Sequence, residues 1–193
     1  MPRIFPAPAR LKLFMKKLTA ALALTFVPFI AVGCSSSGSG SVSKSDVQTK
    51  TGSFYKDKSH EDAKSVSCDG SLPAKVEATQ SCTATAADGQ SWPITVKVTK
   101  VDGKDVYYDL SFTDAFVGPD DVTSSVSDFY REKVGVAPKS STCNGLLRGA
   151  TGATIRCVIT ESDGTRWGVT AKTTNVEGTK VNYDMIVDDQ PLP

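Results

Sequence analysis

The sequence predicts an α+β protein of two tandem repeats, each with one helix packed on a four-stranded antiparallel sheet and closed by one disulfide. Three observations predict this fold. The second half of the chain repeats the first in one ungapped frame, four cysteines recur with equal spacing in the two halves, and the hydrophobic period in each half changes from helical to alternating. We expect repeat 1 at residues 46–113, repeat 2 at 120–188 and a tail at 189–193.

The two halves align without a gap. A single constant shift places residues 54–58 on 129–133 and Trp92 on Trp167. Over residues 68–109, 18 of 42 positions are identical to their counterparts. Such agreement in one frame indicates two copies of the same domain.

Each copy opens with a helical pattern. In repeat 2, apolar residues at spacings of four, seven and eight form one helical stripe: Val122, Val126, Phe129 and Tyr130. Asp120 and Asp121 precede this stripe, where acidic residues favour a helix start. Repeat 1 keeps Val47, Phe54 and Tyr55 but places Thr51 and Gly52 in the middle, so we expect a weaker helix there.

After each helix the apolar residues alternate, which is typical of strands with one buried face. Repeat 1 shows a short strand that ends at Cys68 and three longer strands whose even-numbered residues are mostly apolar: Ala78 to Ala84, Trp92 to Val98 and Val106 to Phe112. The helix is expected to cover the apolar face, and Trp92 and Trp167 to point into the core.

The turns constrain how the strands pair. Since the core residues on neighbouring strands are all even-numbered, cross-strand partners must sum to an even number, which requires loops of odd length. We expect three-residue loops at Asp88-Gly89 and at Asp102-Gly103, with the glycine in a left-handed conformation. This register places Lys97 opposite Asp109, and Lys172 opposite Asp184, on the open face of each sheet.

The N-terminus predicts an exported lipoprotein. Two lysines and about fifteen apolar residues follow Met15, a run shorter than the roughly 20 needed to span a bilayer. We interpret residues 1–33 as a signal peptide and expect translation to begin at Met15. Residues 31–33 resemble the bacterial lipobox, so Cys34 is expected to carry a diacylglycerol and a fatty acyl group such as palmitate. Residues 34–45 then form the lipidated cysteine and a flexible tether. The alternative is a secreted protein cut elsewhere, with Cys34 a free thiol.

Charge and cysteine content narrow the function classes. Removal of residues 1–33 leaves 17 basic and 21 acidic residues, a net charge of −4, which argues against nucleic acid as a partner. An extracytoplasmic location, anchored in the cell membrane, permits disulfides. Four cysteines remain beside Cys34, and one pairing keeps each repeat self-contained: Cys68 with Cys82, and Cys143 with Cys157.

Catalytic and metal sites find little support in the sequence. Thirteen residues separate the cysteines of each pair, whereas structural zinc sites use two to four. The single histidine, His60, aligns with Gly135 and offers no base to a catalytic thiol. We therefore expect no enzyme activity, no cofactor and no metal. The candidate binding face is the open sheet face with Lys97, Tyr107, Asp109, Lys172 and Asp184.

Short motifs carry a family resemblance. VSC, LPA, SCTAT and VDG occur in order in repeat 1, at residues 66–68, 72–74, 81–85 and 101–103. The chain thereby resembles a family of actinobacterial lipoproteins, the domain of unknown function 4333. The resemblance implies a small disulfide-bonded envelope domain and brings no known activity. We expect a non-catalytic binding or structural module of the cell envelope that contacts an unknown envelope component or protein. The alternative is a proteinaceous inhibitor of a secreted or envelope enzyme.

Overall fold

The computed structural model describes residues 40–193. The predicted signal peptide, the predicted lipidation site Cys34 and the predicted tether as far as residue 39 lie outside the described residues. No helix among residues 40–193 is long and apolar enough to cross a membrane.

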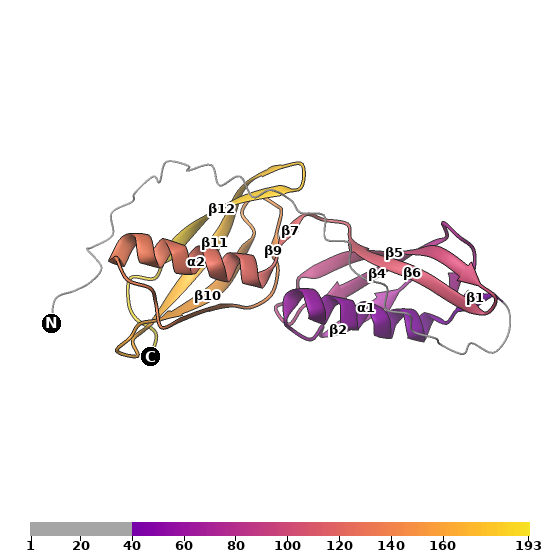
Figure 1. The fold of residues 1–193 in the computed structure, drawn as a ribbon, viewed down its shortest axis with the longest axis horizontal. Helices are drawn as coiled ribbons and strands as arrows, with labels where there is room; N and C mark the ends of the chain where they lie inside the picture. Colours follow the sequence, from indigo (N-terminus) through magenta and orange to yellow (C-terminus); the bar gives the residue numbers. More distant parts are fainter. Residues whose placement is uncertain (1–39) are drawn as a thin grey trace. The chain divides into compact units, whose positions relative to one another are not determined.

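Repeat 1 consists of one helix on a four-stranded antiparallel sheet (Figure 1). Helix α1 (Lys44–Ser59) lies on the sheet formed, in spatial order, by β2 (Ser65–Cys68), β4 (Thr79–Thr85), β5 (Ser91–Asp102) and β6 (Asp105–Phe112). A separate two-residue ladder joins β1 (Ser41–Val42) to β3 (Leu72–Pro73). The paired structure of repeat 1 therefore reaches back to Ser41, ahead of residue 46.

Repeat 2 has the same elements in the same order (Figure 1). Helix α2 (Pro119–Val134) lies on the sheet of β8 (Ser140–Cys143), β10 (Thr154–Thr160), β11 (Arg166–Glu177) and β12 (Lys180–Val187). The short ladder recurs between β7 (Phe116–Val117) and β9 (Leu147–Arg148). The predicted fold class is confirmed: two tandem α+β repeats, each with one disulfide.

The two helices have equal length, although only α2 has a continuous apolar stripe. In α1 the buried Thr51 donates its hydroxyl hydrogen bond to the carbonyl of Val47 at 2.8 Å, so its polar group is satisfied inside the core. Ser43 caps the start of α1 by accepting from the backbone N–H of Asp46. Packing and capping thus give α1 its full length despite its weaker local preference.

The core of each repeat lies between helix and sheet. In repeat 1, Trp92 is 1% exposed and belongs to the same buried cluster as Tyr55 of α1. The even-numbered residues of β5 are buried as predicted: Trp92, Ile94, Val96 and Val98. Trp167 is half-buried, so the two tryptophans differ in exposure.

Both predicted disulfides form, each between directly paired residues of the first two sheet strands. Cys68 joins β2 to Cys82 of β4, and Cys143 joins β8 to Cys157 of β10. All four cysteines are buried. Each bridge closes a short loop. In a domain this small the hydrophobic core alone gives little stability, so the disulfide makes a large contribution to the free energy of unfolding.

One of the two predicted turn types is confirmed and the other is wrong. Between β4 and β5, Ala86 N–H donates to the Gln90 carbonyl and leaves a three-residue loop with Gly89 at φ +88. Between β5 and β6, however, Asp102 pairs with Asp105 around the two-residue loop of Gly103 and Lys104. Type II′ hairpins place glycine at this first central position.

A β-bulge reconciles the two-residue loop with the predicted register. The pairing of β5 with β6 shifts by one residue between Val98 and Lys100, which leaves Thr99 as the extra residue. Beyond the bulge, Lys97 pairs with Asp109 as expected. Repeat 2 has the same bulge between Thr173 and Asn175, and Lys172 pairs with Asp184.

Candidate functional site

The candidate binding face is the side of each sheet that the helix leaves uncovered (Figure 1). Lys97 and Asp109 are exposed cross-strand partners on this face in repeat 1, and Lys172 and Asp184 occupy the same places in repeat 2. Tyr107, two residues before Asp109 on β6, shares the face and is half-buried. The register thus brings the predicted residues together within each repeat.

The cross-strand partners on this face do not form ion pairs with each other. Lys97 Nζ lies 2.7 Å from Glu77 Oε2 instead of contacting Asp109, and no ion pair joins Lys172 to Asp184 within residues 40–193. Glu77 has φ +71, and its backbone N–H donates to the Val98 carbonyl, which holds its carboxylate near Lys97. Both side chains are well exposed, so the pair contributes at most about 1 kcal/mol.

Lys100 is a member of this face that the alternating pattern missed. An even-numbered residue of β5 would ordinarily point into the core, but the bulge at Thr99 turns Lys100 outward. Its ammonium lies 5.4 Å from the centre of the Tyr107 ring and 2.7 Å from Asp102 Oδ2. The hydrogen bond from Lys100 lowers the pKa of the Asp102 carboxyl.

Hydroxyl side chains cover most of the open face of repeat 1. Ser81, Thr95 and Ser111 form one row across three strands. The neighbouring rows add further hydroxyls at exposed or half-buried positions: Ser65, Ser67, Thr83, Thr85, Ser91 and Thr113. Each hydroxyl can donate and accept, so this face offers many hydrogen bonds and little charge.

The open face of repeat 2 carries a charged fork instead. Arg156 donates to Asp188 through both terminal nitrogens, at 2.9 and 2.6 Å, and to Thr170 Oγ1 at 2.6 Å. The fork lies over Gly168, where a Cβ would collide with both Arg156 and Asp188. Its hydrogen bonds lower the pKa of the Asp188 carboxyl and raise the pKa of Arg156. The equivalent positions in repeat 1 are Ser81, Pro93 and Thr113.

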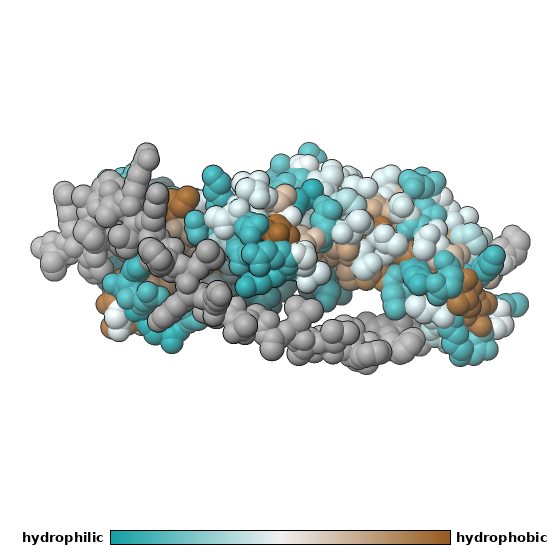
Figure 2. All heavy atoms as spheres, turned by 90° about the horizontal axis from the view of Figure 1, so that it is seen from above, coloured by the Kyte–Doolittle hydropathy of each residue, from teal (hydrophilic) through white to brown (hydrophobic). Residues whose placement is uncertain are grey.

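Apolar residues form no large patch on the visible surface. Figure 2 shows teal and white spheres over most of this face, with brown ones in small separate areas. Within residues 40–193 the exposed large apolar side chains are Val76, Val136 and Ile186. Single exposed apolar residues are normal on a protein surface, so they do not indicate a docking patch.

A buried carboxylate in repeat 2 was not predicted. Glu161 is 6% exposed, and its Oε1 accepts a hydrogen bond of 3.2 Å from the Tyr130 hydroxyl. Burial and the neighbouring Glu161 raise the pKa of Tyr130 to about 12. Repeat 1 has Tyr55 and Ala86 at these positions. Tyr130 and Glu161 lie far apart in the sequence, and no local pattern connects them.

His60 and the cysteines occupy structural positions. His60 ends α1 with φ +61, and its Nε2 lies 3.6 Å from Asp120 Oδ2 at the surface. All four cysteines within residues 40–193 are in disulfides. In this part of the chain, no three side chains among histidine, cysteine, aspartate and glutamate lie close enough to hold a metal ion.

Comparison with known proteins finds one family. The sequence model described as a domain of unknown function (DUF4333) matches twice, at residues 29–103 and at residues 110–178. The two matches correspond to the two repeats. No curated protein and no solved structure matches the chain.

Proposed function

Because the chain belongs to the DUF4333 family, whose description names no activity, we propose its function from the N-terminal signal and the surface. The protein is an exported lipoprotein, anchored in the cell membrane, that acts as a non-catalytic binding or structural module of the cell envelope. Its partner is an envelope component or protein that meets the open sheet face of repeat 1.

The sequence around Cys34 supports the anchor. A short apolar run follows two lysines and ends in Ala31, Val32 and Gly33, directly before the cysteine. Labelling cells with a palmitate analogue tests this part. Label should attach to the wild-type protein and be lost in Cys34→Ala, and equal labelling of the two would refute the anchor.

The hydroxyl-covered sheet face is the observation that carries the binding proposal. The helix covers only one side of the sheet, and the other side presents its serines and threonines on a firm antiparallel scaffold held by the Cys68–Cys82 bridge. A surface with many donors and acceptors and few charges suits a neutral, hydrogen-bonding partner. Lys97, Lys100, Tyr107 and Asp109 lie at one end of this face and can orient that partner.

Capture from envelope extract tests the binding face. We would compare wild-type protein with Thr95→Arg/Ser111→Arg, which places two bulky charges at the centre of the face. Ser53→Arg/Ser124→Arg is the matched control, because it adds the same charge at exposed helix positions. The face variant should lose the captured component while the control keeps it. Equal capture by both would show that this face is not the binding surface.

Inhibition of a secreted or envelope enzyme is the alternative. Tight inhibitors usually rely on aromatic or arginine anchors. Arg156 lies on the repeat 2 face, but Asp188 already engages it through two hydrogen bonds. The same capture distinguishes the alternatives, because a stoichiometric enzyme whose activity falls on binding would favour the inhibitor.

A further inference from the structure

Repeat 2 contacts repeat 1 through residues that repeat 1 itself lacks. Three of them have small or cyclic counterparts at the equivalent positions of repeat 1: Phe116 aligns with Ser41, Leu146 with Ser71, and Arg148 with Pro73. All three contact the same end of repeat 1, which contains the last turn of α1 and the start of β5.

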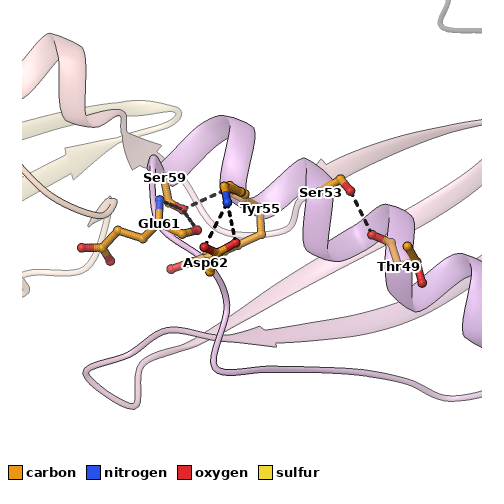
Figure 3. Close-up of polar contacts among 7 residues, drawn as sticks. Thr49, Ser53, Tyr55, Ser59, Glu61 and Asp62 are labelled. Atoms are coloured by element: carbon orange, nitrogen blue, oxygen red, sulfur yellow. Dashed lines mark hydrogen bonds and ion pairs between the residues drawn. The ribbon is translucent and has the colours of Figure 1, made fainter.

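Leu146 extends the core of repeat 1. It is 3% exposed and belongs to the buried cluster of that repeat, together with Tyr55 and Trp92. The neighbouring Gly145 donates its backbone N–H to the Ser59 carbonyl at 3.2 Å. Figure 3 shows this end of α1, where the Ser59 hydroxyl bonds to the backbone of Tyr55 and Glu61. A loop of repeat 2 therefore closes a core that α1 leaves open.

Arg148 adds three contacts beside Leu146. Its guanidinium lies 4.6 Å from the centre of the Trp92 ring, donates to the Ser91 carbonyl and lies 3.3 Å from Asp114 Oδ2. The Arg148 side chain is only 26% exposed, which strengthens charged contacts relative to a free surface. The ring of Phe116 packs on Phe112 with centroids 4.8 Å apart.

The connection between the repeats is short as well. Thr113 donates its N–H to the Pro93 carbonyl and so still belongs to the sheet of repeat 1, whereas Phe116 already pairs with β9 of repeat 2. Only Asp114 and Ala115 lie between the two strand ladders. Even there, the Ala115 carbonyl accepts a hydrogen bond of 2.7 Å from the Gly149 N–H. The chain leaves little length for a hinge.

From these contacts we propose that Phe116, Leu146 and Arg148 form an inter-repeat lock that makes the two repeats one cooperative, rigid unit. The lock is one-directional. Repeat 1 provides the surface that these side chains contact: Trp92, Phe112 and the carbonyls of Ser59 and Ser91. The counterparts of the lock residues in repeat 1 are Ser41, Ser71 and Pro73, which lack the side chains needed to make the same contacts with a further repeat. The lock therefore joins two copies and does not propagate into an open head-to-tail array.

Substitution of two lock residues tests the proposal in the mature chain, kept in solution by Cys34→Ser. The lock variant is Leu146→Ser/Arg148→Ala, and its serine is the residue that repeat 1 carries at the same position. The matched control is Val136→Ser/Arg131→Ala, which makes closely similar chemical changes at exposed positions. Calorimetry should show one transition for wild type and control, and two separate transitions for the lock variant.

Nitrogen-15 relaxation provides an independent readout. The two repeats should tumble with one correlation time in wild type and control, and with shorter, different correlation times in the lock variant. Two transitions or two correlation times in the wild type would overturn the proposal, and so would a lock variant that behaves like the control. If the double variant does not fold, Arg148→Ala alone decides the question: faster independent tumbling supports the lock, and wild-type tumbling refutes it.

Discussion

Replacing Tyr55 and Tyr130 separately by phenylalanine compares what the hydroxyl of the equivalent buried tyrosine contributes to stability in each repeat. Tyr130 is 4% exposed, and its hydroxyl donates to Glu161. Tyr55 is fully buried, and within residues 40–193 its hydroxyl makes no hydrogen bond of ordinary length and angle, since the nearby Ser59 hydroxyl donates to the Tyr55 and Glu61 carbonyls. Ala86 stands where repeat 2 has Glu161. The same chemical change should therefore have unequal effects.

The expected free energies of unfolding follow from these partners. Tyr130→Phe leaves the buried carboxylate of Glu161 without its donor, and losing a hydrogen bond to a charged group costs about 1.5–3 kcal/mol. Tyr55→Phe removes a hydroxyl that is desolvated with little compensation, so the free energy of unfolding should change by about zero or rise slightly. We expect Tyr130→Phe to be the more destabilising by about 2 kcal/mol.

Urea unfolding of a fragment of residues 35–193, followed by tryptophan fluorescence, measures both variants on the same transition. The dependence on urea should stay unchanged, so that a shifted midpoint reports stability alone. Equal destabilisation by the two substitutions, or a larger loss from Tyr55→Phe, would refute the reasoning.

Alkaline pH gives a second measure of Tyr130. Its pKa is raised to about 12, with burial as the largest cause and Glu161 next. An unfolded tyrosine titrates near pH 10, so the Tyr130 contribution is complete below pH 10 and is lost as pH rises from about 10 to 12. Stability should fall faster in this window for wild type than for Tyr130→Phe. Parallel curves for the two proteins would contradict this assignment.

Two further substitutions test covalent and packing features. Cys68→Ala/Cys82→Ala opens a loop with a sequence separation of 14 and should cost about 3 kcal/mol in urea unfolding; a cost below about 1 kcal/mol would count against the bridge as a main stabiliser. Gly168→Ala should displace the fork between Arg156 and Asp188, because the added Cβ occupies its place. The pKa of Asp188, measured by NMR titration, should then rise toward its ordinary value, and an unchanged titration would show that the fork persists.

The repeat made much of the fold predictable from the sequence. Because two copies share one frame, each uncertain element in one copy has a second instance in the other. The even-numbered core of β5 then determined the register that pairs Lys97 with Asp109. The length of the loop between β5 and β6 was harder to predict. A two-residue loop with a bulge at Thr99 pairs the same residues as a three-residue loop without a bulge, so the register does not distinguish the two.

The surface was predictable only in part, because side-chain partners depend on loops that come from elsewhere in the chain. Lys97 contacts Glu77, whose position follows from a left-handed backbone that a glutamate rarely adopts. Glu161 and Arg148 differ from the equivalent residues of repeat 1, which are Ala86 and Pro73. Their partners, Tyr130 and Trp92, are distant in the sequence and become neighbours only in the folded chain.

The bulges at Thr99 and Thr174 also affect how neighbouring molecules meet. Strands β6 and β12 each form one edge of their sheet, with β2 and β8 at the opposite edges, and an edge strand offers unpaired backbone groups to any similar strand nearby. A bulge increases local twist, so each of these hairpins bends away from the flat geometry that strand addition requires. Exposed charges at Asp109 and Asp184 add repulsion between like edges. The β6 and β12 edges are therefore poorly suited to extend the sheets of neighbouring molecules.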